Sequence, residues 1–246
     1  MKKTERFLNP VPIFAFKETL ETFDKLKVSL VLPPNMEELD NREKLLRGAE
    51  DLFLKYGLRS VSMDDIARHL GISKKTIYQH FADKDEVVAT VTKSHTNSLR
   101  QKFENIAAES KNAVEELVKI SVCIKETMRN MNPSLLFDMQ KYHQRAWTEW
   151  LAFKMKFIRQ NVVRSVSQGI AEGYFREDIH IDILTTMRLE QVQMAFDHTV
   201  FPRDKFSLPE VQAQLLEHFM YGLFTDKGRK LYQKYKQQNP EHYTIH

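Results

Sequence analysis

The chain has 246 residues, a formal net charge of +4 and a single cysteine, Cys123. Hydrophobic residues make up 42% and charged residues 28%, which is typical of a globular protein with a substantial core. No apolar run approaches the ~18 residues that a membrane span needs, and one cysteine excludes an intrachain disulfide framework. These features predict a soluble cytoplasmic protein that does not contact a membrane. Only seven glycines and eight prolines favour long helices over a turn-rich β fold.

Residues 1–36 precede the first strong helical pattern. Phe16, Leu20 and Phe23 fit one face of a short amphipathic helix. Three interpretations of this extension remain open. It packs on the protein's own surface, translation starts instead at Met36, or the extension contacts DNA or widens a dimer interface.

Residues 61–84 predict a helix, a tight turn, a second helix and the start of a third. Ser62, followed three residues later by Asp65, forms an acidic variant of the capping box that opens a helix. Gly71 stands where a helix C-terminus needs a left-handed residue. Ser73 then caps the second helix. The order of these signals predicts a helix-turn-helix unit.

The second helix, 74–80, has one apolar and one polar side. Ile77 and Phe81 stand four residues apart and point one side toward a core. The outward residues are Lys74, Lys75, Thr76, Tyr78, Gln79 and His80. An exposed helix with two adjacent lysines and no acid suits the major groove of DNA, although in isolation it would fit a merely solvated face.

This segment resembles the helix-turn-helix of the TetR-type (tetracycline-repressor-like) transcriptional regulators. The resemblance covers residues 40–92. It implies an all-α fold, with an N-terminal three-helix DNA-binding head followed by a helical ligand-binding and dimerisation body. We therefore expect an N-terminal extension at 1–36, a DNA-binding domain at 37–83 and a regulatory domain at 84–246. The matching residues are Ala67, Leu70, Gly71, Ile72, Ser73, Thr76, Ile77, Tyr78, His80, Phe81 and Lys84, preceded by a helical stripe of Leu45, Leu46, Ala49, Leu52, Phe53 and Tyr56 that ends at Gly57.

The predicted DNA contacts divide into base readers and phosphate binders. Lysines at the start of the second helix favour guanine edges, while tyrosine and histidine donors suit phosphate oxygens. Lys84 begins the next helix, where backbone N–H groups already favour a phosphate, and the helix opened by Ser62 offers a second such N-terminus. The full predicted set is Ser62, Met63, Ser73, Lys74, Lys75, Thr76, Tyr78, His80 and Lys84.

After Lys84 the chain is helical almost throughout, with a long helix that should end near Glu104 and link the head to the body. Residues 134–172 are rich in aromatic side chains, and Gly173 marks a break. An aromatic helical region can line an apolar effector cavity or simply form core. The candidate ligand-binding residues are Phe137, Tyr142, Trp147 and Trp150.

Two later segments, 181–200 and 208–224, carry apolar residues on more than one face. A surface helix buries one stripe, so these helices are either central in the core or packed against a partner chain. The family resemblance implies a four-helix bundle built from two helices of each subunit in a homodimer. The predicted interface residues are Leu184, Met187, Val192, Ala195, Leu215 and Phe219.

The predicted function is a dimeric transcriptional repressor, released from a pseudo-palindromic DNA operator by a small, mainly apolar effector. One alternative is a DNA-binding regulator without such an effector, controlled by a protein partner or by its own abundance. Another is a helical enzyme or binding protein that keeps an idle helix-turn-helix. The sequence offers no catalytic constellation, glycine-rich phosphate loop or metal-ligand spacing, so we expect no enzyme activity, no cofactor and no metal. It does not identify the effector, the operator or the regulated genes. It also does not show whether the protein represses or activates transcription.

Overall fold

The computed structural model describes residues 36–238, with side chains from residue 41 onward. The chain divides into two units between residues 40 and 41, and the description below concerns the second. The predicted all-α fold is confirmed, whereas the predicted helix in residues 1–36 lies outside the described residues. In chain order the helices are α2 (Met36–Tyr56), α3 (Met63–Leu70), α4 (Lys74–His80), α5 (Lys84–Glu109), α6 (Ala113–Arg129), α7 (Leu135–Tyr142), α8 (Gln144–Ala152), the π-helical segment η1 (Phe153–Ile158), α9 (Arg159–Ala171), α10 (Ile181–Met194), α11 (Leu208–Leu223) and α12 (Asp226–Gln238).

Local capping explains where α3 and α4 begin. The Asp65 N–H donates to Ser62 Oγ at 3.2 Å, and the Ser62 N–H donates to the Asp65 carboxylate at 2.9 Å, which confirms the capping box. Gly71 ends α3 with φ +65°, in the left-handed region that glycine tolerates best. Ser73 Oγ accepts the Thr76 N–H at 3.1 Å and opens α4. The helix-turn-helix therefore follows from contacts within a few residues.

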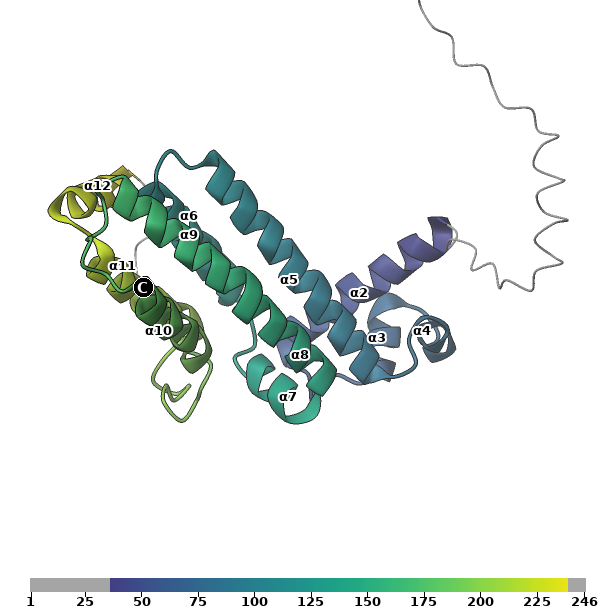
Figure 1. Ribbon diagram of the computed structural model, residues 1–246. Coiled ribbons are helices and arrows are strands. Elements are labelled where there is room, and N and C mark those ends of the chain that lie inside the picture. The colour runs from purple at the N-terminus through teal and green to yellow at the C-terminus, as the bar shows by residue number, and fades with distance from the viewer. Residues whose placement is uncertain (1–35, 239–246) are drawn as a thin grey trace, which may run out of the picture. The chain divides into compact units, whose positions relative to one another are not determined.

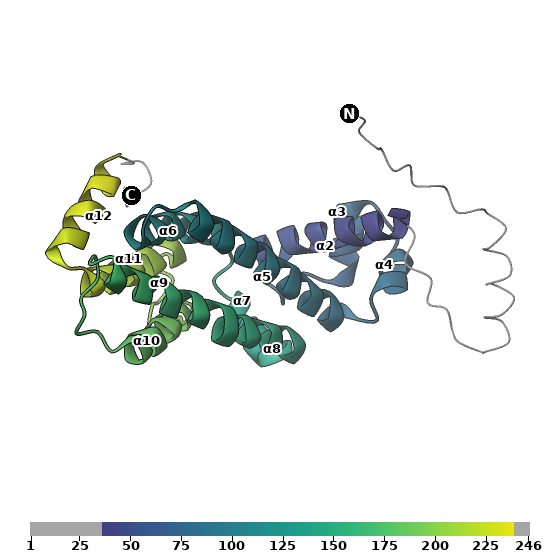
Figure 2. The same ribbon diagram turned by 45° about the horizontal axis from the view of Figure 1, so that its top comes forward.

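Helix α5 runs the length of the molecule's described body. It begins at the N-cap Asp83, whose carboxylate accepts the Glu86 N–H at 2.8 Å. It continues to Glu109, five residues past the end predicted from the sequence. Phe103, which is buried, holds this last part of the helix against the body. In both views α5 lies beside α8, and α3 and α4 stand at its N-terminal end (Figures 1 and 2).

One hydrophobic cluster extends from the helix-turn-helix into the body. It includes Phe53 of α2 and Ile77 of α4, and it continues through Val88 of α5 to Trp150 and Phe196. A second cluster joins α6, α9, α11 and α12. Because the first cluster is continuous, the head and the body share buried apolar surface and are not separate cores.

Polar contacts also connect α2 with the body. Glu50 Oε1 lies 2.6 Å from His95 Nδ1 of α5. The backbone N–H of Asn132, just after α6, donates to the carbonyl of Leu54 at 2.6 Å. The boundary predicted at residues 83 and 84 coincides with the Asp83 cap of α5. As a boundary between domains it stays a prediction.

Candidate functional site

The outward face of α4 carries basic and polar side chains and no acid. Ile77 and Phe81 are buried, so the other side of this segment belongs to the core. Tyr78 is 47% exposed although it is large and aromatic, and such a side chain is available to a partner. Of the predicted DNA contacts here, Ser73, Lys74, Lys75 and Tyr78 are exposed, while Thr76 and His80 are half-buried.

Lys74 is held by an acid that the sequence reasoning did not single out. Its Nζ donates to Asp64 Oδ2 of α3 at 2.9 Å. The hydrogen bond and the charge of Asp64 raise the pKa of Lys74, which keeps the lysine protonated. This pair orients the side chain between α3 and α4, and Lys74 must leave Asp64 before it can contact a base. Lys75 has no such neighbour among the contacts of the described residues.

The N-terminus of α3 exposes Ser62 but not the side chain of Met63. Met63 is 6% exposed and belongs to the core, so this residue can offer a phosphate only its backbone N–H. The hydrogen bonds from Ser62 lower the pKa of Asp65, whose carboxylate completes the capping box. That carboxylate stands beside the N–H groups that a phosphate would use. The N–H and hydroxyl groups of Ser62 are both engaged by this carboxylate, and contact of Ser62 and Met63 with a phosphate stays a prediction.

Lys84 lies partly inside the protein. Its Nζ donates to the backbone carbonyl of Leu58, in the connection between α2 and α3. Burial is the main cause that lowers the pKa of Lys84. The side chain thus holds the α2–α3 connection to the start of α5. Its contact with a phosphate stays a prediction, and a substitution here will also disturb the fold.

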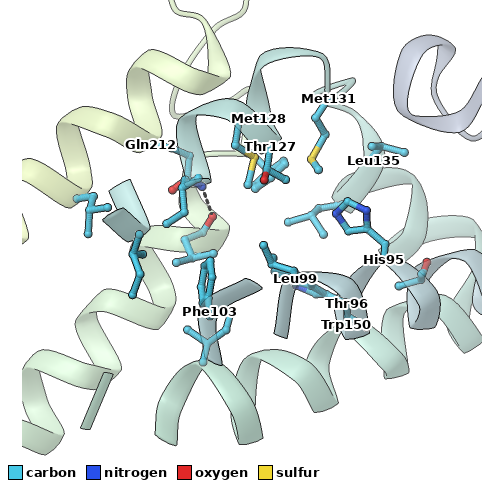
Figure 3. A pocket seen from close by; sticks show the side chains of 18 of the residues that line it. His95, Thr96, Leu99, Phe103, Thr127, Met128, Met131, Leu135, Trp150 and Gln212 are labelled. Carbon is cyan, nitrogen blue, oxygen red and sulfur yellow. Dashed lines mark hydrogen bonds between the residues drawn. The ribbon is translucent and has the colours of Figure 1, made fainter. Parts of the chain in front are cut away.

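A cavity of about 160 Å³ lies within the helical body. Its wall is almost entirely apolar and combines Phe53, Leu54 and Leu58 from α2 and its following connection with side chains of α5 to α11. Figure 3 shows this space with His95 and Gln212 on opposite sides of it. Enclosed apolar space of this kind is typical of small-molecule sites. The labelled lining residues are His95, Thr96, Leu99, Phe103, Thr127, Met128, Met131, Leu135, Trp150 and Gln212.

Only one of the four predicted ligand-binding aromatics reaches this cavity. Trp150 is buried and lines it, but Phe137, Tyr142 and Trp147 do not. Phe137 and Tyr142 are 41% and 43% exposed on α7. Phe137, Tyr142 and Trp147 lie outside the lining of this cavity, and ligand contact at these residues stays a prediction. Helix α7 ends and α8 begins at His143, between Tyr142 and Trp147.

Charged groups at the cavity were not predicted. Glu50 and His95 both line it, so the contact between α2 and α5 forms part of its wall. Arg188 of α10 also lines it and is 4% exposed. Burial lowers the pKa of Arg188 to about 10, so the guanidinium stays charged at neutral pH. No sequence signal identifies Arg188, because an arginine on an amphipathic helix is usually solvated.

The predicted dimer residues divide into buried and exposed groups. Ala195 and Phe219 are 6% and 4% exposed within one chain, and Phe219 lines the cavity. Interior packing accounts for these two side chains without a partner, and their place in a dimer interface stays a prediction. Leu184, Val192 and Leu215 are partly buried, and Met187 is 40% exposed. Several other apolar residues of α11, among them Leu216 and Met220, are buried within the chain.

The described residues contain neither a candidate membrane span nor a candidate metal site. Among residues 36–238, no helix is long and apolar enough to cross a membrane. In the same part of the chain, no group of three or more His, Cys, Asp or Glu side chains is arranged to hold a metal ion.

Comparisons with known proteins agree with this geometry. The family model for bacterial regulatory proteins of the tetR family matches residues 45–91. The HTH-type transcriptional regulator SAB2452 of Staphylococcus aureus (strain bovine RF122 / ET3-1) is 30% identical over 165 residues, 67% of this chain and 82% of that protein. The HTH-type transcriptional repressor KstR2 of Mycobacterium tuberculosis is 27% identical over 146 residues, 58% of this chain and 73% of that protein.

Solved structures share the fold. The structure of KstR2 matches with a TM-score of 0.54 at 24% identity and covers 76% of this chain and 96% of that one. The regulator FadR from Bacillus subtilis, solved in complex with stearoyl-CoA, matches with a TM-score of 0.52 at 16% identity and covers 74% and 98%. With its helix-turn-helix, its all-helical body and these relatives, the chain belongs to the tetR family of bacterial regulatory proteins and is a DNA-binding transcriptional regulator.

Proposed function

We propose that the protein is a homodimeric repressor that binds a pseudo-palindromic operator through α4 and leaves it when a small, mainly apolar effector fills the cavity. One observation carries this proposal: the cavity wall includes Phe53, Leu54 and Leu58. These residues belong to the same core that positions α3 and α4. An effector that expands the wall therefore acts directly on the packing of the DNA-reading head. KstR2 is named a transcriptional repressor, which supports repression rather than activation.

On the operator, the two lysines at the start of α4 read bases and the surrounding hydroxyl groups hold phosphates. Lys75 is exposed, and Lys74 becomes available when it leaves Asp64. Ser73, Thr76, Tyr78 and His80, with the backbone at Ser62 and Met63 and the ammonium of Lys84, fix the register on the phosphates. In this assignment residues 37–83 are the DNA-binding domain and residues 84–246 the regulatory domain.

The Glu50–His95 contact couples the cavity to the head. It joins α2 to α5 at 2.6 Å, and both side chains line the cavity. An effector can shift the equilibrium only if it binds the DNA-competent and incompetent arrangements differently. Movement of this contact supplies such a difference, because it changes how α2 lies on α5. The two half-sites of an operator lie one helical turn of DNA, about 34–36 Å, or a multiple of it apart. A small tilt of the heads therefore moves both α4 helices away from their half-sites.

The dimer surface follows from the exposed apolar side chains of α10. Ile183 and Met187 are 62% and 40% exposed and stand four residues apart, on one face. On α11 the exposed positions include His218, Tyr221 and Gly222, and nothing lies within 4 Å of a Cβ placed at Gly222. We place the seam on these faces, in place of the buried Phe219 and Ala195. Partly buried Leu184, Val192 and Leu215 border it.

The cavity favours this function over a regulator controlled only by a protein partner, because such a regulator has no use for enclosed apolar space. The exposed face of α4 argues against an idle helix-turn-helix in an enzyme. FadR from Bacillus subtilis, a protein of this fold, was solved in complex with stearoyl-CoA, which has a long apolar acyl chain. We expect no catalytic activity and no cofactor.

The test is selection of bound sequences from random duplex DNA. We expect an enriched inverted repeat and affinity that falls steeply with salt, because many contacts are to phosphates. Lys75→Ala should relax the base preference by roughly 1–3 kcal/mol per lost contact, whereas Tyr78→Phe should weaken all sequences alike. Lys234→Ala, on exposed α12, is the matched control and should change neither. Recovery of no inverted repeat contradicts the proposal.

A further inference from the structure

Arg188 differs from every other buried charge described in the body. It is 4% exposed, and its NH1 has no hydrogen-bond partner. The guanidinium lies over the ring of Phe219, with 5.9 Å between Cζ and the ring centroid. Within residues 36–238 no carboxylate lies within ion-pair distance of this guanidinium. A charge buried in apolar surroundings without a partner is costly, so its retention calls for an explanation.

Other buried charges of the same body are paired. Lys154, also 4% exposed, donates to Glu190 at 3.1 Å and to Gln193 at 2.7 Å. Glu116, 1% exposed, accepts hydrogen bonds from the guanidinium of Arg164. The fold thus supplies partners where a charge is structural. Arg188, by contrast, lines the cavity and has a guanidinium nitrogen without a partner.

The remaining unpartnered groups of the cavity wall are also donors. Trp150 Nε1 and Ser165 Oγ are buried, line the cavity and have no hydrogen-bond partner. An indole N–H donates only, and a hydroxyl donates readily to an anion. The acceptor that sits near Arg188 in sequence, Gln191 Oε1, is unpartnered and does not line the cavity. The wall therefore offers a cation and two donors to whatever enters.

We propose that the cavity binds a small monocarboxylic acid with an apolar body, whose carboxylate pairs with Arg188. The guanidinium presents two parallel N–H donors that match a carboxylate. The apolar body lies along Leu99, Ile124 and Met128. Glu50, also at the wall, is paired with His95, so the unpaired charge of Arg188 calls for one negative charge in the ligand. This inference rests on the proposed effector cavity and names the chemical class that the cavity takes.

The cavity volume limits the size of this acid. About 160 Å³ is close to the roughly 150 Å³ of an engineered apolar cavity that takes up benzene. The ligand body is therefore about the size of one ring or a short chain. A carboxylic acid, with a pKa of about 4, is ionised at neutral pH, where Arg188 is charged. Octanoate and 3-phenylpropanoate are suitable probes, and the primary amide of each acid is its uncharged control.

Calorimetric titration of the dimeric protein with these four probes tests the inference. Wild-type protein should bind each acid about ten- to a hundredfold more tightly than its amide. Arg188→Met should lower acid affinity to that of the amide and leave amide binding unchanged, which also shows that the variant is folded. Arg203→Met, at an exposed arginine outside the cavity, should behave as wild type. Equal binding of acid and amide by wild type, retention of acid preference by Arg188→Met, or no binding of any probe overturns the inference.

Operator release measured with the same probes separates this inference from the proposed function. If an acid binds through Arg188 but leaves the operator complex intact, the ligand class stands and the effector mechanism fails. If the amides release the operator as well as the acids do, the effector mechanism stands and the anionic class fails. Preference for the coenzyme A thioester of the same acid over the free acid also overturns the carboxylic-acid assignment, because a thioester carries no carboxylate for Arg188 and its negative charges are the phosphates of coenzyme A.

Discussion

Replacing Arg188 with methionine should raise the thermal stability of the ligand-free protein. Burial lowers the pKa of this arginine to about 10, and at 1.36 kcal/mol per unit the lowering corresponds to roughly 3 kcal/mol. The sign follows from the folded pKa lying below the unfolded one. The charged form is disfavoured in the folded state, so the penalty is complete below about pH 10 and disappears as the pH rises past the ordinary pKa of arginine.

Methionine keeps an unbranched apolar side chain at this position and removes the charge. Roughly 3 kcal/mol corresponds to a rise in Tm of about 6–12 °C for a chain of this length. This is the upper value, because any packing contacts that arginine makes and methionine does not would reduce the rise. The assay is thermal unfolding followed by circular dichroism at pH 7.5, on protein stripped of small molecules, with Arg203→Met as the surface control. A fall in Tm for Arg188→Met refutes the reasoning, because it means that the guanidinium has a stabilising partner.

Three further predictions concern the head, the dimer and the body. Asp64→Asn should free Lys74 and tighten operator binding roughly two- to fivefold in gel-shift titrations, as expected for loss of an exposed ion pair; weaker binding would contradict the pairing. Met187→Glu should give folded monomers in sedimentation analysis, since the side chain is 40% exposed, and an unchanged dimer would move the seam elsewhere. Gly169→Ala should destabilise the protein by about 1–3 kcal/mol in denaturant titrations, because the new Cβ would lie 2.1 Å from the ring of Phe175; unaltered stability would show that this ring moves aside.

The head could be predicted from the sequence because its signals are local. Ser62, Asp65, Gly71 and Ser73 act on backbone groups within four residues, so each one specifies its helix end without help from the rest of the chain. The inward direction of Ile77 follows from the same short-range spacing. The all-α body was likewise accessible, since few glycines and prolines interrupt its helices.

The site residues of the body depend on contacts between helices that are distant in the sequence, and the sequence does not show which helices meet. The break between α7 and α8 falls at His143, which is neither proline nor glycine, so no local signal separates Phe137 and Tyr142 from Trp150. Phe219 shows a second difficulty, because an apolar stripe looks the same whether it meets another subunit or its own core. The isolation of Arg188 arises only where α9, α10 and α11 enclose one cavity.

The π-helical segment η1 makes the chain intolerant of length changes at one particular place. Wider turns of this kind usually arise when one residue is inserted into an α-helix, and they are common near functional sites. Removing one residue between Phe153 and Ile158 would restore a regular helix and rotate everything after it by about 100° relative to α8. Ser165 and Val166 would then turn away from the cavity while Trp150 stayed in place. Among relatives of this chain, alignment gaps within this segment should therefore accompany a change in which compounds the regulator senses.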